Sequence, residues 1–214
     1  MTLRTLLERA YSGYKIEFIG HQGGTLAQFA ARPHADRKDI ALLAGHMPWG
    51  AQAALPGSRA ITVLRDPVER VISFFYYSKR APNAMHYKAI NEQGITLRDA
   101  VESGMLTPEY NTQTNMLRDQ RAVGASQALE SAKRNLRACA GFGLVERFDE
   151  SAAYLARELR WPDATWETQN VTPSRPRAED LEPDLLERLH HETGVDRLLY
   201  DDAAALFEKR IKAG

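Results

Sequence analysis

Arg65 and Ser73 are residues whose types and spacing suggest anion binding. In ITVLRDPVERVISFFYY an aliphatic run ends at Leu64, Arg65 and Asp66 form a turn, and Pro67 stands where a helix would begin. Proline suits the first helical position because its missing N–H has no helical partner there. Helix N-termini at the carboxyl ends of strands attract anions. Arg65 is therefore placed to meet a phosphate, and Ser73, nearly two turns into the helix, could donate its hydroxyl to the same anion.

The same residues have a structural interpretation. Arg65 could pair with Asp66 or with Glu69, since opposite charges within one helical turn commonly interact. Ser73 could be a small packing residue. Spacing alone leaves both interpretations open.

His46 is the histidine best placed to act as a general base. It directly follows the aliphatic run DIALLAG, residues 39–45, which puts it at the carboxyl end of a strand on the same edge as Arg65. Imidazole changes charge near neutral pH, so histidine is the usual base for a hydroxyl proton. A histidine that caps the strand by hydrogen bonding is the structural alternative.

The stretch KIEFIGHQGGTLAQF, residues 15–29, also has the outline of a phosphate-binding loop. An aliphatic strand is followed by Gly23, Gly24 and Thr25 and then by a helical pattern. The loop nevertheless lacks a lysine, and the G-x-x-x-x-G-K-[ST] motif occurs nowhere in the chain. That absence counts against a kinase or another phosphoryl-transfer nucleotidase.

The elements that must position these residues alternate between helix and strand, which favours a parallel α/β sheet. Short aliphatic runs bounded by polar residues predict buried parallel strands; they are residues 15–19, 39–45, 60–64 and 141–145. Helical patterns are predicted for the very first residues, with Gly13 near the end of that helix, and for 67–80, the segment capped by Thr96 and Asp99, 107–118, 126–138, about 149–159 and two C-terminal helices. The loop 170–177, with two prolines and two arginines, is the segment expected to be most flexible.

Length and composition favour a single domain, residues 1–214, with one ordinary core. Basic and acidic residues number 28 each, so no bulk field favours nucleic acid or an anionic membrane. The one cysteine, Cys139, is expected to be a core thiol. No apolar run is long enough for a membrane span and the N-terminus lacks a signal-peptide core, so a cytoplasmic protein is expected.

Several segments together resemble sulfotransferases that use 3′-phosphoadenosine 5′-phosphosulfate, especially the group that includes heparan sulfate 2-O-sulfotransferase and its bacterial relatives. The stretch from Arg65 through Arg70 to Ser73 resembles the 3′-phosphate-binding motif of that family. The resemblance extends to further segments, which are GHMPWG (45–50), NTQTNML (111–117), GLVERFDESAAYLARELRW (143–161), NVTPSRP (170–176) and VDRLLYDDAAALF (195–207). The resemblance covers nearly the whole chain. The motifs together are specific for this family, whereas any one of them alone would be a weak signal.

The resemblance implies a nucleoside-triphosphatase-like fold with a parallel central sheet flanked by helices. It implies that Arg65 and Ser73 hold the 3′-phosphate of the donor, and that His46, which matches the family's catalytic histidine, takes the acceptor's proton without a metal. Arg175 resembles part of the segment that folds over the nucleotide, where a guanidinium could clamp a phosphate. A solvated loop arginine is the alternative for Arg175.

The acceptor implied by the resemblance is a hydroxyl compound, most plausibly a carbohydrate. Lys79 and Arg80 could meet it, or could simply form a solvated helix end. Asn111, Gln113 and Thr114 could line an acceptor cleft, although a structural role is preferred. Oligomeric state is not indicated by the sequence.

The family's loop for the 5′-phosphosulfate, Pro-Lys-Thr-Gly/Ala-Gly-Thr-Thr/Ser-Leu, has no counterpart in the chain. Its last residues would match Thr2 and Leu3, so the first strand and the lysine are expected to be missing, and the glycines at 23–24 are expected to form a variable turn. Such a loop stabilises charge that develops on the leaving phosphate. Two interpretations stay open, namely an active sulfotransferase and a truncated, catalytically inactive nucleotide-binding paralogue.

Overall fold

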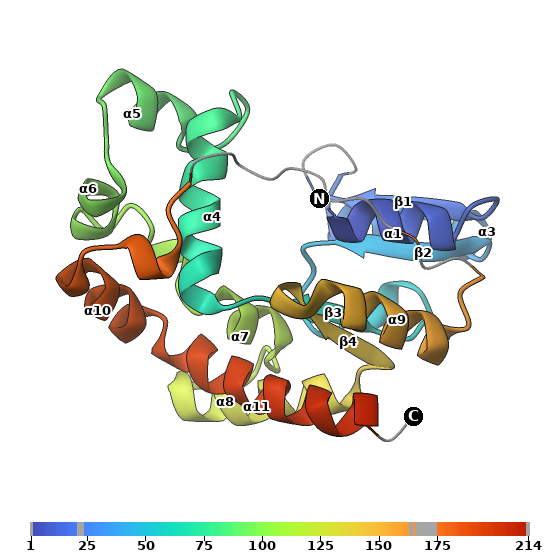
Figure 1. Ribbon diagram of the computed structural model, residues 1–214. Coiled ribbons are helices and arrows are strands. Elements are labelled where there is room, and N and C mark those ends of the chain that lie inside the picture. Colours follow the sequence, from blue (N-terminus) through green and yellow to red (C-terminus); the bar gives the residue numbers. More distant parts are fainter. Residues whose placement is uncertain (1, 21–23, 163–164, 166–174, 213–214) are drawn as a thin grey trace.

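The computed structural model describes residues 2–20, 24–162, 165 and 175–212. Helices and parallel strands alternate along the chain (Figure 1), which confirms the predicted α/β class. No helix of this described part is both long enough and apolar enough to cross a membrane.

The strands form parallel pairs. β1 (Lys15–Ile19) pairs with β2 (Ile40–Gly45), and β3 (Ile61–Leu64) pairs with β4 (Gly141–Leu144), so each predicted strand is present. Among the described residues no ladder joins β2 to β3, and the parallel strands of the predicted sheet therefore lie as separate two-stranded sheets (Figure 1). The parallel direction brings the carboxyl ends of paired strands to one edge, which is where ligands bind in α/β folds.

Helices occupy most of the remaining described chain. The α-helices are α1 (Thr2–Ala10), α2 (Leu26–Ala30), α3 (His34–Arg37), α4 (Pro67–Arg80), α5 (Tyr87–Glu92), α6 (Leu97–Glu102), α7 (Thr112–Leu117), α8 (Gly124–Ala138), α9 (Phe148–Leu159), α10 (Pro183–Glu192) and α11 (Gly194–Lys212). The short 3₁₀-helices are η1 (Ala51–Ala54), η2 (Thr107–Glu109), η3 (Val145–Arg147) and η4 (Ala178–Asp180).

One predicted helix is wrong in its extent. The sequence pattern predicts a continuous helix over 107–118, but the structure has η2, a break, and then α7. Asn111 stands at the break with φ 53°, in the left-handed region that a helix interior excludes and that asparagine tolerates better than most residues. The predicted cap of α6 is confirmed, because Thr96 and Asp99 form a capping box.

Three apolar clusters hold these elements together. One packs β3 and β4 against α8, α9 and α11, with Phe142 and Phe207 fully buried. A second joins α4 to α6 and α10, and a third lies under β1, β2 and α2 around Phe29. Cys139 is buried, and burial raises the pKa of its thiol to about 11, so the predicted core thiol is confirmed.

Figure 1 shows how this packing frames the strand ends. The strands lie on one side, and α4 with α5, α6 and α10 forms a helical lobe on the other. The segment that carries η4 runs beside α4 (Figure 1), and a hydrogen bond from the Ala178 N–H to Glu69 joins the two. The helical lobe therefore lies beside the turn that connects β3 to α4, which contains Arg65 and Asp66.

Gly143 is required by the close approach of α9 to β4. A Cβ atom added at Gly143 would lie 2.6 Å from Cβ of Ser151, whose hydroxyl oxygen accepts a hydrogen bond from the Leu144 N–H at 2.8 Å. Neither the strand nor the serine can move without loss of that bond. We expect Gly143→Ala to lower the free energy of unfolding by about 1–3 kcal/mol, the usual cost of overpacking.

Urea denaturation of the variant measures this loss. Gly194→Ala is the matched control, since an added Cβ there meets nothing within 4 Å, and it should leave the unfolding midpoint close to that of the wild type. An unchanged midpoint for Gly143→Ala would contradict the packing described for β4 and α9.

Candidate active site

The turn after β3 is held by the side chain of Gln113 on α7. The Gln113 Oε1 accepts a hydrogen bond from the Arg65 N–H at 2.8 Å, and its Nε2 donates to the Arg65 carbonyl at 2.9 Å. Both backbone polar groups of Arg65 are thus satisfied by one amide. The position of the Arg65 side chain is therefore coupled to α7.

Asp196, which is buried in α11, fixes the start of α7 in turn. Its carboxylate accepts hydrogen bonds from the N–H groups of Gln113 (3.1 Å) and Thr114 (2.7 Å), and its own N–H donates to Asn111 Oδ1 (2.9 Å). An aspartate at a helix N-terminus satisfies N–H groups that have no helical partner. These bonds agree with the structural role preferred for Asn111, Gln113 and Thr114.

The start of α4 is capped as its sequence suggests. Asp66 accepts hydrogen bonds from the N–H groups of Val68 (3.0 Å) and Glu69 (3.1 Å), with Pro67 at the first helical position. The Asp66 carboxylate also forms an ion pair with Arg197 of α11. The acidic side chain next to Arg65 is thus committed to helix capping and to α11.

Arg65 and Arg175 come together although they lie far apart in the sequence. Glu69 Oε2 lies 2.8 Å from Nη2 of Arg175 and 3.7 Å from Nη2 of Arg65. The side chain of Arg65 is only 24% exposed and that of Arg175 only 20%. The interpretation of Arg175 as a solvated loop residue is therefore wrong. The pairing of Arg65 with Glu69, given above as the structural interpretation of Arg65, is present, and it leaves other N–H groups of Arg65 for a phosphate.

The two guanidinium groups retain unused donors. Nε of Arg65 and Nη1 of Arg175 are buried and make no hydrogen bond within the described part of the chain. Burial lowers the pKa of Arg65 below its ordinary value, and the positive charge of Arg175 lowers it further, while Glu146, Glu69 and Asp66 act in the opposite direction. Buried donors without partners are rare in proteins, and here they leave positive charge that an anion would compensate.

Ser73 lies on the same face of α4 as these groups. It follows Glu69 by four residues, which is the spacing that places side chains one above the other on a helix. It is partly buried, and its hydroxyl has no hydrogen-bond partner among the described residues. Arg70, by contrast, is used structurally, because it donates to the carbonyl of Glu109 at 2.9 Å and pairs with its carboxylate at 3.0 Å.

His46 follows β2 directly, as predicted, and is exposed. The close approach of β1 explains the glycine before it, since a Cβ at Gly45 would lie 2.3 Å from the carbonyl oxygen of Ile19. No hydrogen bond to the His46 imidazole is found in the described part of the chain, so the capping alternative has no support there. Met47 and Trp49, which follow it, are partly buried and pack against two different apolar clusters.

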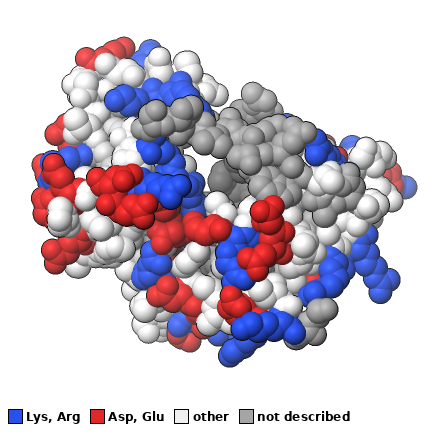
Figure 2. Space-filling view, viewed as in Figure 1, with Lys and Arg blue, Asp and Glu red and all other residues white. Residues whose placement is uncertain are grey.

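Lys79 and Arg80 end α4 and are exposed. Within the described residues neither forms an ion pair, so both charges are available to solvent or to a ligand. On the face shown in Figure 2, basic and acidic side chains are interspersed and no large field of one sign appears. This agrees with the balanced charge of the sequence, and a binding site on this face for an anion would have to be local.

The glycine stretch after β1 is not built as a phosphate loop in the residues described. Gly20 and Gly24 form an antiparallel bridge, and Thr25 caps the short helix α2 in a capping box with Gln28. The N–H groups of Gln28 and Thr25 are therefore already used. Gly23 lies outside the described residues.

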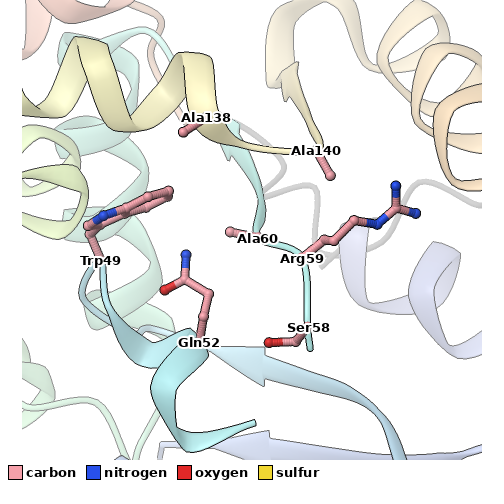
Figure 3. A pocket seen from close by; sticks show the side chains of 7 residues that line it. All are labelled: Trp49, Gln52, Ser58, Arg59, Ala60, Ala138 and Ala140. Atoms are coloured by element: carbon pink, nitrogen blue, oxygen red, sulfur yellow. The ribbon is translucent and has the colours of Figure 1, made fainter. Parts of the chain in front are cut away.

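A surface pocket of about 420 Å³ lies at the opposite ends of β3 and β4 (Figure 3). Arg59 and Ala60 precede β3 and Ala140 precedes β4, so the pocket is at the amino ends of these strands, away from Arg65. Trp49 and Gln52 approach it from the other side (Figure 3). We therefore place the candidate site at the carboxyl ends, where the unused arginine donors are.

Glu69, Glu146 and Tyr200 lie at or next to the site and were not predicted as part of it. Glu146, after β4, accepts a hydrogen bond from the Asp66 N–H at 3.0 Å and another from the Tyr200 hydroxyl at 2.7 Å. Burial raises the pKa of Tyr200, and the hydrogen bond to Glu146 raises it further. The four-residue spacing between Arg65 and Glu69 indicates in the sequence that the two side chains can meet. No local pattern in the sequence indicates that Glu146 lies beside Asp66.

No metal site emerges from the residues that are described, since no three histidine, cysteine, aspartate or glutamate side chains gather suitably. Asn170 and Ser174, which resemble part of the nucleotide-covering segment, lie outside the described residues.

Curated sulfotransferases resemble the chain in sequence. Heparan-sulfate 6-O-sulfotransferase 1 of Homo sapiens is 28% identical over 188 residues, covering 71% of this chain and 44% of that protein. Heparan-sulfate 6-O-sulfotransferase 1-B of Danio rerio is 28% identical over 182 residues, with the same shares of 71% and 44%. Heparan-sulfate 6-O-sulfotransferase 2 of Danio rerio is 28% identical over 181 residues, covering 71% and 38%. No protein-family model matches the chain.

These similarities support a sulfotransferase family for the chain and, with it, the predicted nucleoside-triphosphatase-like fold. The curated relatives are enzymes by name, which agrees with the prediction of an enzyme by family resemblance. The relatives are 6-O enzymes by name, so the predicted 2-O group is not specified by them. The chain spans less than half the length of these curated relatives.

Proposed function

We propose that this chain carries the nucleotide-binding half-site of a sulfotransferase that uses 3′-phosphoadenosine 5′-phosphosulfate and transfers its sulfuryl group to a carbohydrate hydroxyl. One observation carries the proposal: Arg65 and Arg175 meet at the carboxyl end of β3 with buried N–H groups that have no partner among the described residues. A phosphate supplies acceptor oxygens for such donors in charge-assisted hydrogen bonds. Ser73, on the same face of α4, adds a hydroxyl donor.

The nucleotide that donates the sulfuryl group matches these residues in charge and in hydrogen-bonding groups. Its 3′-phosphate is a dianionic group that matches two guanidinium groups and one hydroxyl, and its negative charge would stabilise the positive charge that burial disfavours on Arg65. The bound donor would supply the sulfuryl group and the leaving phosphate. The chain's own residues bind and orient the 3′ end of the nucleotide.

His46 is the residue we assign to the acceptor. It follows β2, and its imidazole is exposed and without a described partner, so it is available to accept the proton of an attacking hydroxyl. Lys79 and Arg80, which are unpaired within the described part, would favour an anionic glycan. The relatives named for heparan sulfate support a glycan of that kind, with the 2-O or 6-O position decided by the acceptor cleft.

The alternative function is a nucleotide-binding protein without turnover. Both functions require the same 3′-phosphate site. They differ in whether transfer follows binding.

Ligand-dependent thermal unfolding tests the shared requirement. Adenosine 3′,5′-bisphosphate should raise the melting temperature, because a ligand at about 100 times its Kd stabilises the native state by about 2.7 kcal/mol. Adenosine 5′-monophosphate is the control and should protect less, since it has no 3′-phosphate for the two arginines. An absent shift with millimolar adenosine 3′,5′-bisphosphate would contradict the proposed function, and transfer of labelled sulfate to heparan would separate the two alternatives.

A further inference from the structure

Glu69 lies at the centre of the candidate site and has no role in the function proposed so far. It is on the first turn of α4, four residues before Ser73 and on the same face of the helix, and its carboxylate lies 3.7 Å from Nη2 of Arg65, which precedes the helix. A carboxylate beside a phosphate site would ordinarily repel the ligand. Its contacts indicate why it is there.

The Glu69 carboxylate joins two separate segments. Oε2 pairs with Arg175 at 2.8 Å and lies 3.7 Å from Nη2 of Arg65, while Oε1 accepts a hydrogen bond from the Ala178 N–H at 2.8 Å. The segment that carries Arg175 is therefore attached to α4 at two points, one on a side chain and one on the backbone. With a side chain only 19% exposed, Glu69 is screened little by solvent.

This attachment opposes a repulsion between the two arginines. Both guanidinium groups lie beside the same carboxylate oxygen, Glu69 Oε2, so their like charges are close together. In agreement with this, the charge of Arg175 lowers the pKa of Arg65, and Glu69 acts in the opposite direction. Arg175 lies outside any helix or strand, since η4 begins only at Ala178. Without Glu69 it would be free to turn away from Arg65, because a loop arginine gains rotamer freedom when released.

We infer that Glu69 is a positioning residue that holds Arg175 against Arg65, so that both guanidinium groups are available to one phosphate. The inference rests on the proposed function, since the phosphate is the 3′-phosphate of the nucleotide. Pre-organisation of this kind improves affinity by removing the cost of ordering the loop at the moment of binding. The gain outweighs the repulsion between the Glu69 carboxylate and the anion.

Calorimetric binding of adenosine 3′,5′-bisphosphate to variants of the full chain tests the inference. Glu69→Gln keeps the size of the side chain and one oxygen for the Ala178 N–H, but it removes the charge that faces both arginines. We expect it to weaken binding roughly ten- to a hundredfold, the loss that corresponds to a charge-assisted hydrogen bond. Glu69→Ala should weaken binding at least as much.

A double-mutant cycle distinguishes positioning from a general effect on stability. If Glu69 acts through Arg175, the variant that combines Glu69→Ala with Arg175→Ala should bind no more weakly than Arg175→Ala alone. Binding of adenosine 5′-monophosphate should stay unchanged in all these variants. Glu179→Ala is the matched control, because Glu179 is a 74% exposed glutamate in the same segment whose described ion pair is with the exposed Arg177.

Tighter or unchanged binding of adenosine 3′,5′-bisphosphate by Glu69→Gln would overturn the inference, because it would show that the carboxylate only repels the ligand. Additive losses in the double variant would overturn it as well. If Arg65→Ala weakens binding while Glu69→Gln does not, only the positioning role fails. If the wild-type chain does not bind adenosine 3′,5′-bisphosphate at all, the proposed function itself fails.

Discussion

Arg65→Ala is expected to abolish the thermal protection that adenosine 3′,5′-bisphosphate gives. Removing one member of a desolvated, hydrogen-bonded charge pair costs about 2–5 kcal/mol of binding free energy, which is about thirtyfold or more in Kd. Arg65 should be at the upper end of that range, because Gln113 holds its backbone through both the N–H and the carbonyl, and its buried Nε has no other partner in the described part of the chain.

The fold should tolerate this substitution. The only ion pair described for the Arg65 side chain is a long one with Glu69 at 3.7 Å, and both burial and the charge of Arg175 disfavour its charged form, so the ligand-free protein loses little when it is removed. Arg59→Ala is a suitable control, because Arg59 is exposed and precedes β3 at its amino end. Wild-type protection of Arg65→Ala by the ligand would mean that the 3′-phosphate binds elsewhere.

His46→Ala is expected to lower turnover about a hundred- to ten-thousandfold, the usual contribution of a general base. Binding of adenosine 3′,5′-bisphosphate should stay the same, since His46 follows β2 while the arginines follow β3 and the 175–178 segment. Sulfate transfer to a heparan acceptor, measured with a form of the protein that shows transfer, gives the rate. Titration with the bisphosphate gives the affinity.

Two features make His46→Ala easy to interpret. The imidazole is exposed and has no described hydrogen bond, so its removal should not disturb the strand, whereas Gly45 before it is sterically required. His34→Ala is the control, because His34 is an exposed histidine on α3. Equal turnover of His46→Ala and the wild type would exclude His46 as the base, and a parallel loss of donor binding would indicate a binding role instead.

Local signals in the sequence predicted most of the elements. The aliphatic runs at 15–19, 60–64 and 141–145 became strands, and Asp66 with Pro67 began α4, because apolar periodicity and capping depend on near neighbours in the chain. The break at Asn111 was missed because a helical composition surrounds it and only its tertiary bonds to Glu192 and Asp196 show why the chain turns there.

The pairing of strands was beyond local signals. Periodicity predicts that a strand is buried on both faces, but it does not say which strand lies beside it. The structure pairs β1 with β2 and β3 with β4, and leaves β2 and β3 unjoined among the described residues.

The sequence by itself determined the chemistry that this protein can offer, since Arg65 and His46 follow strands, and Ser73 lies on a helix, that their near neighbours in the chain specify. Only the tertiary structure decided that Arg175 meets Arg65 across more than a hundred residues of chain, through the carboxylate of Glu69, for which the sequence indicates only a pairing with Arg65. The physical reason is that a charge cluster is set by burial and distance in space. Neither quantity can be obtained from spacing along the chain once the residues belong to different elements.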